Sequence, residues 1–169
     1  MTIAIALTLA ACVAASYTDV RARRIPNALT GSLAAAAAIV HAFGGWQQLV
    51  VSLGVMALLT IGGALIYSRG GIGGGDIKLA IAASGMLSYP LCVPFLLYTA
   101  LAGGALAVLF IALRPNERPS FSRIALTTIG ATNGITAQRV TLPYAVAFAA
   151  GAIVVALSQS LLPFLRINL

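Results

Sequence analysis

The sequence has few charged residues. Of its 169 residues, 8% are charged and 60% are apolar, and the mean hydropathy is +1.02. Soluble domains carry about 25% charged residues. This composition excludes a disordered chain and an ordinary soluble enzyme, and it predicts an integral membrane protein. The net charge of +7 comes from bases lying between apolar runs. They form no basic, aromatic-interleaved surface, so we expect no nucleic-acid partner.

Groups that bind metals or act as nucleophiles are also scarce. The two cysteines, Cys12 and Cys92, lie far apart in apolar runs and form no CxxC pair, so we expect no metal site. The one histidine, His41, falls near the far end of an apolar run, where we expect a structural role. GxSxG, HExxH and Walker motifs are absent. The sequence therefore predicts chemistry without a cofactor.

Long apolar runs are what the chain does have. A membrane helix needs about 20 apolar residues, so six helices use about 120. The length therefore leaves no room for a separate soluble domain, and we expect residues 1–169 to form a single all-α, multi-pass membrane domain. The fourth run is the shortest. The six predicted helices are 2–18, 28–43, 49–67, 76–88, 91–113 and 141–162.

The basic residues are distributed asymmetrically. With six helices, the loops 19–27, 68–75 and 114–140 share one side of the membrane. Nine of the ten basic residues lie on that side, and only Arg166 lies on the other. Basic loops mark the cytoplasmic face. We therefore expect this side to be cytoplasmic and both termini to lie outside.

The chain has only three acids, namely Asp19, Asp76 and Glu117. Glu117 lies in a polar loop and is simply explained as a solvated charge. Asp19 ends the first predicted helix and Asp76 begins the fourth, on the same side and at similar depth. Either one alone is explained by a solvated position at the membrane interface. Their scarcity and shared depth favour a functional pair.

Two facing carboxyl groups can share one proton, because like charges at close range resist joint ionisation. The ionised member can then deprotonate a water, and the protonated member can polarise a peptide carbonyl. This is the chemistry of an aspartic peptidase. A helix amino terminus favours negative charge and a carboxyl terminus disfavours it. On this basis we expect Asp76 to ionise more readily and Asp19 to hold the proton.

Two other functions are compatible with the acids. Aspartates within a membrane commonly couple ions or protons in transporters and channels. A transporter or channel component needs polar residues across the bilayer, and Thr8, Ser32 and Ser84 are scattered. A structural assembly subunit would leave the acid pair without a role. The oligomeric state is not determined by the sequence.

Two segments resemble the motifs of type IV prepilin peptidases. Residues 73–79, GGGDIKL, resemble the GxGDxK motif, and residues 19–27, DVRARRIPN, resemble the first aspartate motif. The IPN ending is typical of the short enzymes that serve tight-adherence (Flp) pili. The two aspartates are 57 positions apart. Residues 143–147, with Gly151 beyond, resemble the last-helix segment of the family.

The resemblance implies cleavage of the leader from prepilin-like precursor peptides. The reaction would take place at the cytoplasmic face of the bacterial inner membrane, with Asp19 and Asp76 as catalytic residues. Longer family members add a methyltransferase part with paired CxxC motifs, which this chain lacks, so we do not expect methylation. Residues matched to supporting positions for substrate or for the acid pair are Gly73, Gly75, Lys78, Arg24, Pro26 and Asn27.

Overall fold

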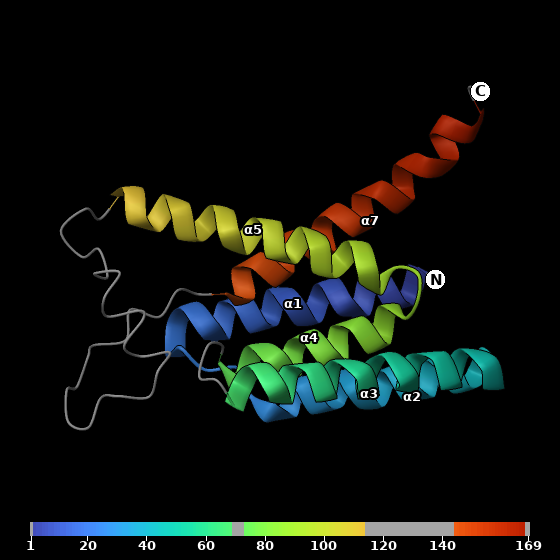
Figure 1. Ribbon diagram of the computed structural model, residues 1–169. Coiled ribbons are helices and arrows are strands. Elements are labelled where there is room, and N and C mark those ends of the chain that lie inside the picture. The colour runs from blue at the N-terminus through green and yellow to red at the C-terminus, as the bar shows by residue number, and fades with distance from the viewer. Residues whose placement is uncertain (1, 69–72, 114–143, 168–169) are drawn as a thin grey trace.

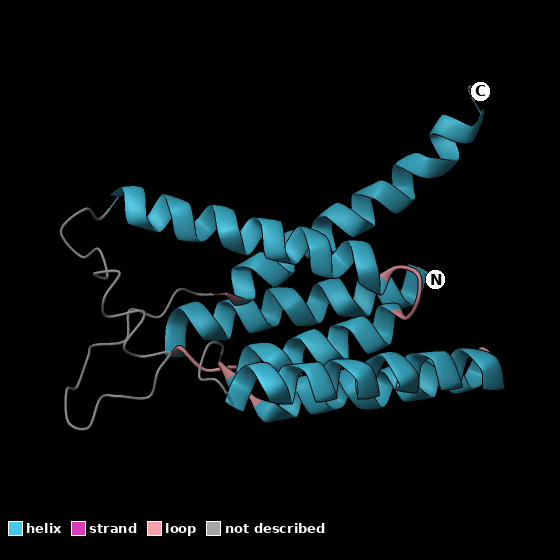
Figure 2. Cartoon of the chain, in the orientation of Figure 1, coloured by secondary structure: helices cyan, strands magenta, loops and turns pink. Residues whose placement is uncertain are grey.

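The chain is a bundle of helices. The computed structural model describes residues 2–68, 73–113 and 144–167, and these parts contain helices and no strand (Figures 1 and 2). The expected all-α fold is confirmed. The helices are α1 Thr2–Ala22, α2 Asn27–Phe43, α3 Trp46–Ser68, α4 Gly74–Leu87, α5 Cys92–Leu113 and α7 Ala145–Ile167.

Among the described residues, three helices are long and apolar enough to cross a membrane, through the segments Ile3–Ala22, Trp46–Ser68 and Cys92–Leu109. The segments Asn27–Phe43 and Ala145–Ser160 are apolar but shorter. Six helices were expected and six are described, with α4 the shortest, as its apolar run indicated. Helix α4 has 14 residues, which is about 21 Å of helix, whereas the hydrocarbon core is about 30 Å thick.

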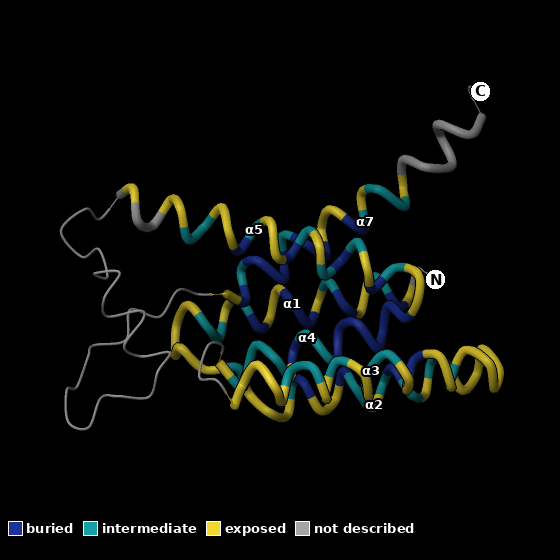
Figure 3. The backbone as a smooth tube through the Cα atoms, in the orientation of Figure 1, coloured by how far each residue is buried: buried dark blue, intermediate teal, exposed yellow. Residues whose placement is uncertain are grey.

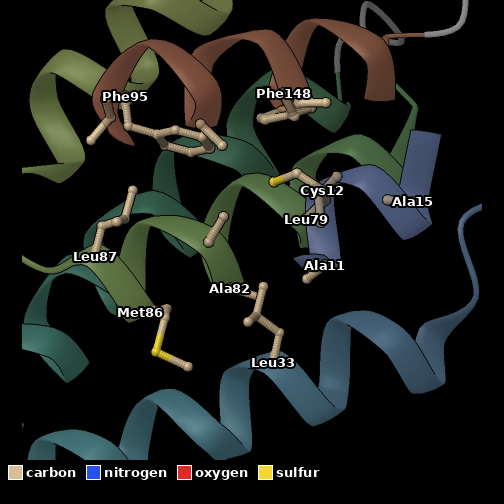
Figure 4. Packing of buried hydrophobic residues seen from close by; sticks show 14 of the residues in the cluster. Ala11, Cys12, Ala15, Leu33, Leu79, Ala82, Met86, Leu87, Phe95 and Phe148 are labelled. Atoms are coloured by element: carbon tan, nitrogen blue, oxygen red, sulfur yellow. The ribbon is translucent and has the colours of Figure 1, made fainter. Parts of the chain in front are cut away.

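Helix α4 lies at the centre of the bundle, in contact with α1, α2, α3 and α5. Leu79, Ala82, Ala83 and Met86 are buried on it (Figures 3 and 4). Small residues of α1, among them Ala11, pack in the same cluster. Because the longer helices surround it, α4 can be shorter than the bilayer and still be shielded from lipid.

Apolar side chains also cover the outside of the bundle. On α3, Leu58, Ile61 and Leu65 recur at helical spacing and are all more than half exposed. A soluble protein rarely exposes large apolar patches. This surface fits a chain whose solvent is lipid.

Helix α7 packs against both α1 and α5. The rings of Phe95 and Phe148 lie 6.1 Å apart between α5 and α7. At Gly151 the two helices approach so closely that an added Cβ would lie 3.0 Å from the backbone nitrogen of Thr99. The carboxyl-terminal half of α7 then extends away from the other helices (Figure 1).

The carboxyl end of α1 and the amino ends of α4 and α7 lie at the same end of the bundle, away from both chain termini (Figure 1). Helix α1 continues one turn beyond the predicted end at residue 18, so Asp19 lies in its last turn. Helix α4 begins two residues before Asp76, which places Asp76 in its first turn. The predicted loop 114–140 lies outside the described residues.

Candidate active site

Asp19 and Asp76 lie within electrostatic reach of each other. Helix α1, which carries Asp19, packs against α4, which carries Asp76, and both side chains are half-buried. The charge on Asp19 acts on the ionisation of Asp76. Two residues far apart in sequence are therefore brought to one place by the packing of α4 on α1.

The surroundings of Asp76 oppose the ionisation of its carboxyl group. It lies in the first turn of α4, which is not among the candidate membrane spans. Burial, and then the negative charge of Asp19, raise the pKa of Asp76 from 3.8 to about 6. The sequence argument used the helix dipole alone and expected easy ionisation of Asp76, so for this residue the shift has the opposite sign. The helix dipole does favour a charge at this position, but desolvation and a neighbouring like charge both oppose it.

Asp19 faces the amino terminus of a second helix. Its Oδ2 accepts a hydrogen bond from the backbone N–H of Ala145, at 3.3 Å, and Ala145 is the first residue of α7. Backbone N–H donors and the positive end of a helix dipole stabilise a carboxylate. The sequence argument considered only the carboxyl end of the helix that contains Asp19. It therefore missed the opposing effect of α7.

The structure also places Ser16 at the site, which sequence reasoning did not select. Its hydroxyl lies 2.8 Å from the carbonyl oxygen of Ala145 and 2.7 Å from that of Cys12. Ser16 precedes Asp19 by three positions, so both lie on one face of α1. That spacing is the sequence signal that could have selected Ser16. Nothing local in the sequence, however, shows that α7 packs against this face of α1.

Gly73 and Gly75 flank the Asp76 carboxyl group. Gly73 precedes α4 in an extended conformation, φ −65° and ψ 136°, which any residue can adopt. A larger residue at position 73 is disfavoured by lack of space, because an added Cβ would lie 3.1 Å from Oδ2 of Asp76. At Gly75 an added Cβ would lie 3.3 Å from Cβ of Ile25. The two glycines thus allow close approach to the carboxylate and to the chain between α1 and α2.

Lys78 points toward α2. Its ammonium group donates to Oδ1 of Asn27 at 2.9 Å, in an exposed position. The two residues lie at an open groove of about 290 Å³ between α2 and α4, whose walls include Gly31 and Ala82. The hydrogen bond therefore links Lys78 to Asn27, the first residue of α2.

Arg24 and Pro26 lie in the short connection between α1 and α2. Arg24 is exposed. The carbonyl of Pro26 accepts the N–H groups of Leu29 and Thr30, at 3.1 and 3.4 Å, and so begins α2. Pro26 fixes the start of that helix, and with it the position of Asn27. No contact to Asp19 or Asp76 is resolved for either residue.

The remaining titratable candidates lie away from the acids. The Nε2 atom of His41 is 3.0 Å from the carbonyl oxygen of Met86, at the opposite end of α4. Cys12 and Cys92 are free and buried. Within residues 2–68, 73–113 and 144–167, no group of three or more His, Cys, Asp or Glu side chains could hold a metal ion.

Comparison with known proteins identifies one family. Residues 6–108 match the model of the type IV leader peptidase family. The match covers more than half of the chain and contains both Asp19 and Asp76. Neither the search of curated proteins nor the search of solved structures gave a match.

Proposed function

This chain belongs to the type IV leader peptidase family, and we propose that it removes the leader of prepilin-like precursors with Asp19 and Asp76 as its catalytic pair. One observation supports this mechanism above all. The chain's two acids within the matched region interact electrostatically, where α4 and α7 each pack on α1. Such a pair can hydrolyse a peptide bond as an aspartic peptidase does.

The proposed reaction starts with one carboxylate and one carboxylic acid. Asp19 takes a proton from a water, and the water oxygen bonds to the carbonyl carbon of the scissile peptide. Asp76 gives its proton to the carbonyl oxygen, which yields a neutral tetrahedral diol. The C–N bond then breaks, the amine leaves with the proton held by Asp19, and a hydroxyl proton of the diol returns to Asp76. The peptide is thereby divided into an acid and an amine, and the pair is restored.

The environments of the two acids support this division of roles. The N–H of Ala145 donates to Asp19, which suits a group that starts as a carboxylate. Burial raises the pKa of Asp76 to about 6, which suits a group that must hold a proton. Two carboxyl groups whose environments separate their ionisation are the usual arrangement for acid and base catalysis.

The proposal extends to the place of the reaction. The basic loops around the acids support an active site facing the cytoplasm and termini on the outside of a bacterial inner membrane. The IPN segment at residues 25–27 supports the tight-adherence (Flp) subtype. We propose one peptidase domain over residues 1–169, acting without a cofactor on a precursor held at the membrane surface.

The direct test is cleavage of a prepilin-like precursor by the purified protein in detergent. The expected products, identified by mass spectrometry, are the leader and the shortened precursor. A folded protein that cleaves no precursor across a range of pH values would contradict the proposal. Proton flux through the same protein in liposomes would then favour a transporter.

The pH dependence of cleavage follows from the raised pKa of Asp76. Asp76 holds its proton below pH 6 and loses it as the pH rises through about 6. Because only the protonated form can donate to the carbonyl oxygen, we expect kcat/KM to fall by about tenfold from pH 7 to pH 8. The thermal midpoint at each pH controls for unfolding. A flat profile between pH 6 and pH 8 would contradict the role of Asp76 as the acid.

Gly73 provides a test of the space beside Asp76. In Gly73→Ala the new Cβ would press on Oδ2 of Asp76, and a displacement of the catalytic group by a fraction of an ångström is costly. We expect kcat to fall by about tenfold with little change in thermal midpoint. Gly74→Ala is the control, since its Cβ would make ordinary contact, at 3.4 Å, with the ring of Tyr67. Equal rates for the two variants would contradict this role.

A further inference from the structure

Ala145, the first residue of α7, is attached to α1 through both of its backbone polar groups. The N–H of Ala145 donates to Oδ2 of Asp19 at 3.3 Å, and its carbonyl oxygen accepts from the hydroxyl of Ser16 at 2.8 Å. The same hydroxyl lies 2.7 Å from the carbonyl oxygen of Cys12, one turn back in α1. Ser16 thus links the backbone of its own helix to the residue that contacts Asp19.

This link joins two well-defined elements. Ala145 is fully buried, and the carbonyl of Tyr144 accepts the N–H groups of Ala147 and Phe148, so the first turn of α7 is closed. The N–H that reaches Asp19 is therefore part of a helix, and it moves only when α7 moves. Together with the Asp19 carboxylate, the Ser16 side chain of α1 resists such a movement at this point.

The described helices that pack on α1 carry few charged side chains. Residues 145–160 of α7 carry no charged side chain, and α2 carries only His41, at its far end. Arg21 donates to the hydroxyl of Tyr17. Lys78 of α4 donates to Asn27. Of the groups on these helices, Asp76 of α4 is one whose charge interaction with Asp19 is resolved.

We propose that Ser16 is a positioning residue, which holds the amino-terminal turn of α7 against α1 so that the Ala145 N–H orients the Asp19 carboxylate. The inference rests on the proposed function, because it assigns to Ser16 a part in the reaction of that site. A donor fixed in advance stabilises the charged base without reorganisation during the reaction. Loss of the Ser16 hydroxyl would let α7 move away and would make the carboxylate less well placed and more easily protonated.

The test compares Ser16→Ala and Ser16→Thr with the parent, by kcat and KM for precursor cleavage as functions of pH. In Ser16→Ala we expect kcat to fall by about tenfold with KM unchanged. The acid limb of its kcat/KM profile should move to higher pH than in the parent, because a less well-placed donor stabilises the carboxylate form less. Ser16→Thr keeps the hydroxyl and should stay within about twofold of the parent.

Ser158→Ala is the matched control. Ser158 of α7 is also part-buried, but its hydroxyl donates only within its own helix, to the carbonyl of Val155, so we expect parental kinetics.

Parental kcat and pH profile in Ser16→Ala would overturn the positioning role and leave the proposed function intact. Equal losses in Ser16→Ala and Ser16→Thr, with lower thermal midpoints and an unshifted profile, would show that Ser16 acts only in packing. A folded parent that cleaves nothing would overturn both the function and this role.

Discussion

We expect Asp19→Asn and Asp76→Asn each to lower the rate of precursor cleavage by about a thousandfold or more. Asparagine has nearly the shape of aspartate, but it can neither accept the proton of the attacking water nor give a proton to the carbonyl oxygen. The measurement is the initial rate of leader release by each purified variant in detergent. Circular dichroism and gel filtration establish that each variant is folded.

The chain offers a matched control for this loss in Glu117, its third acid. Glu117→Gln makes the same change from carboxylate to amide and should cleave at the parental rate. Full activity in Asp76→Asn would refute the pair outright. Loss in all three variants would indicate a general effect of charge rather than catalysis by two carboxyl groups.

Gly151→Ala should destabilise the protein strongly for a change of one methyl group. An added Cβ would meet the hydroxyl of Thr99 and lie 3.0 Å from the Thr99 nitrogen and 3.1 Å from the carbonyl oxygen of Phe95. Backbone atoms of α5 cannot move aside as the end of a side chain can, so α5 and α7 must separate. Overpacking of this kind costs about 1–3 kcal/mol, and we expect a clear fall in thermal midpoint in detergent.

Gly104→Ala is the control for this variant. No atom lies within 4 Å of the position where its Cβ would lie, and alanine is favoured over glycine within a helix by about 0.5–1 kcal/mol. We expect its thermal midpoint to be unchanged or raised. Because α7 also carries Ala145 to Asp19, Gly151→Ala should cleave more slowly than Gly104→Ala even where both are folded. Equal midpoints and equal rates would contradict the close α5–α7 contact.

The sequence predicted the helices well because apolar run length is a local property. In lipid every backbone polar group must be satisfied within the segment, so continuous apolar runs form helices. The predicted starts and ends of the described helices therefore fall within a few residues of the observed ones. The burial of α4 at the centre of the bundle was less predictable. Its burial beneath longer helices depends on packing, and composition alone suggested a short membrane span.

The candidate acids were also accessible from the sequence, because three acids leave few choices. Their surroundings were not. For Asp76 the dipole of its own helix gave the wrong sign, because burial and the charge of Asp19 outweigh it. For Asp19 the hydrogen-bond donor that the sequence did not reveal is Ala145, 126 positions away. Contacts at that separation depend on how α7 packs against α1, which no local pattern specifies.

The central claim is that Asp19 and Asp76 act as one unit. The most direct measurement is the residual cleavage rate of the double variant Asp19→Asn/Asp76→Asn beside those of the two single variants. Residues that act together are not additive, since removing either one already disables the reaction. We therefore expect all three variants to have the same residual rate. A double variant slower than either single variant by a further factor of about a thousand would show that the two carboxyl groups act independently, and would contradict the account.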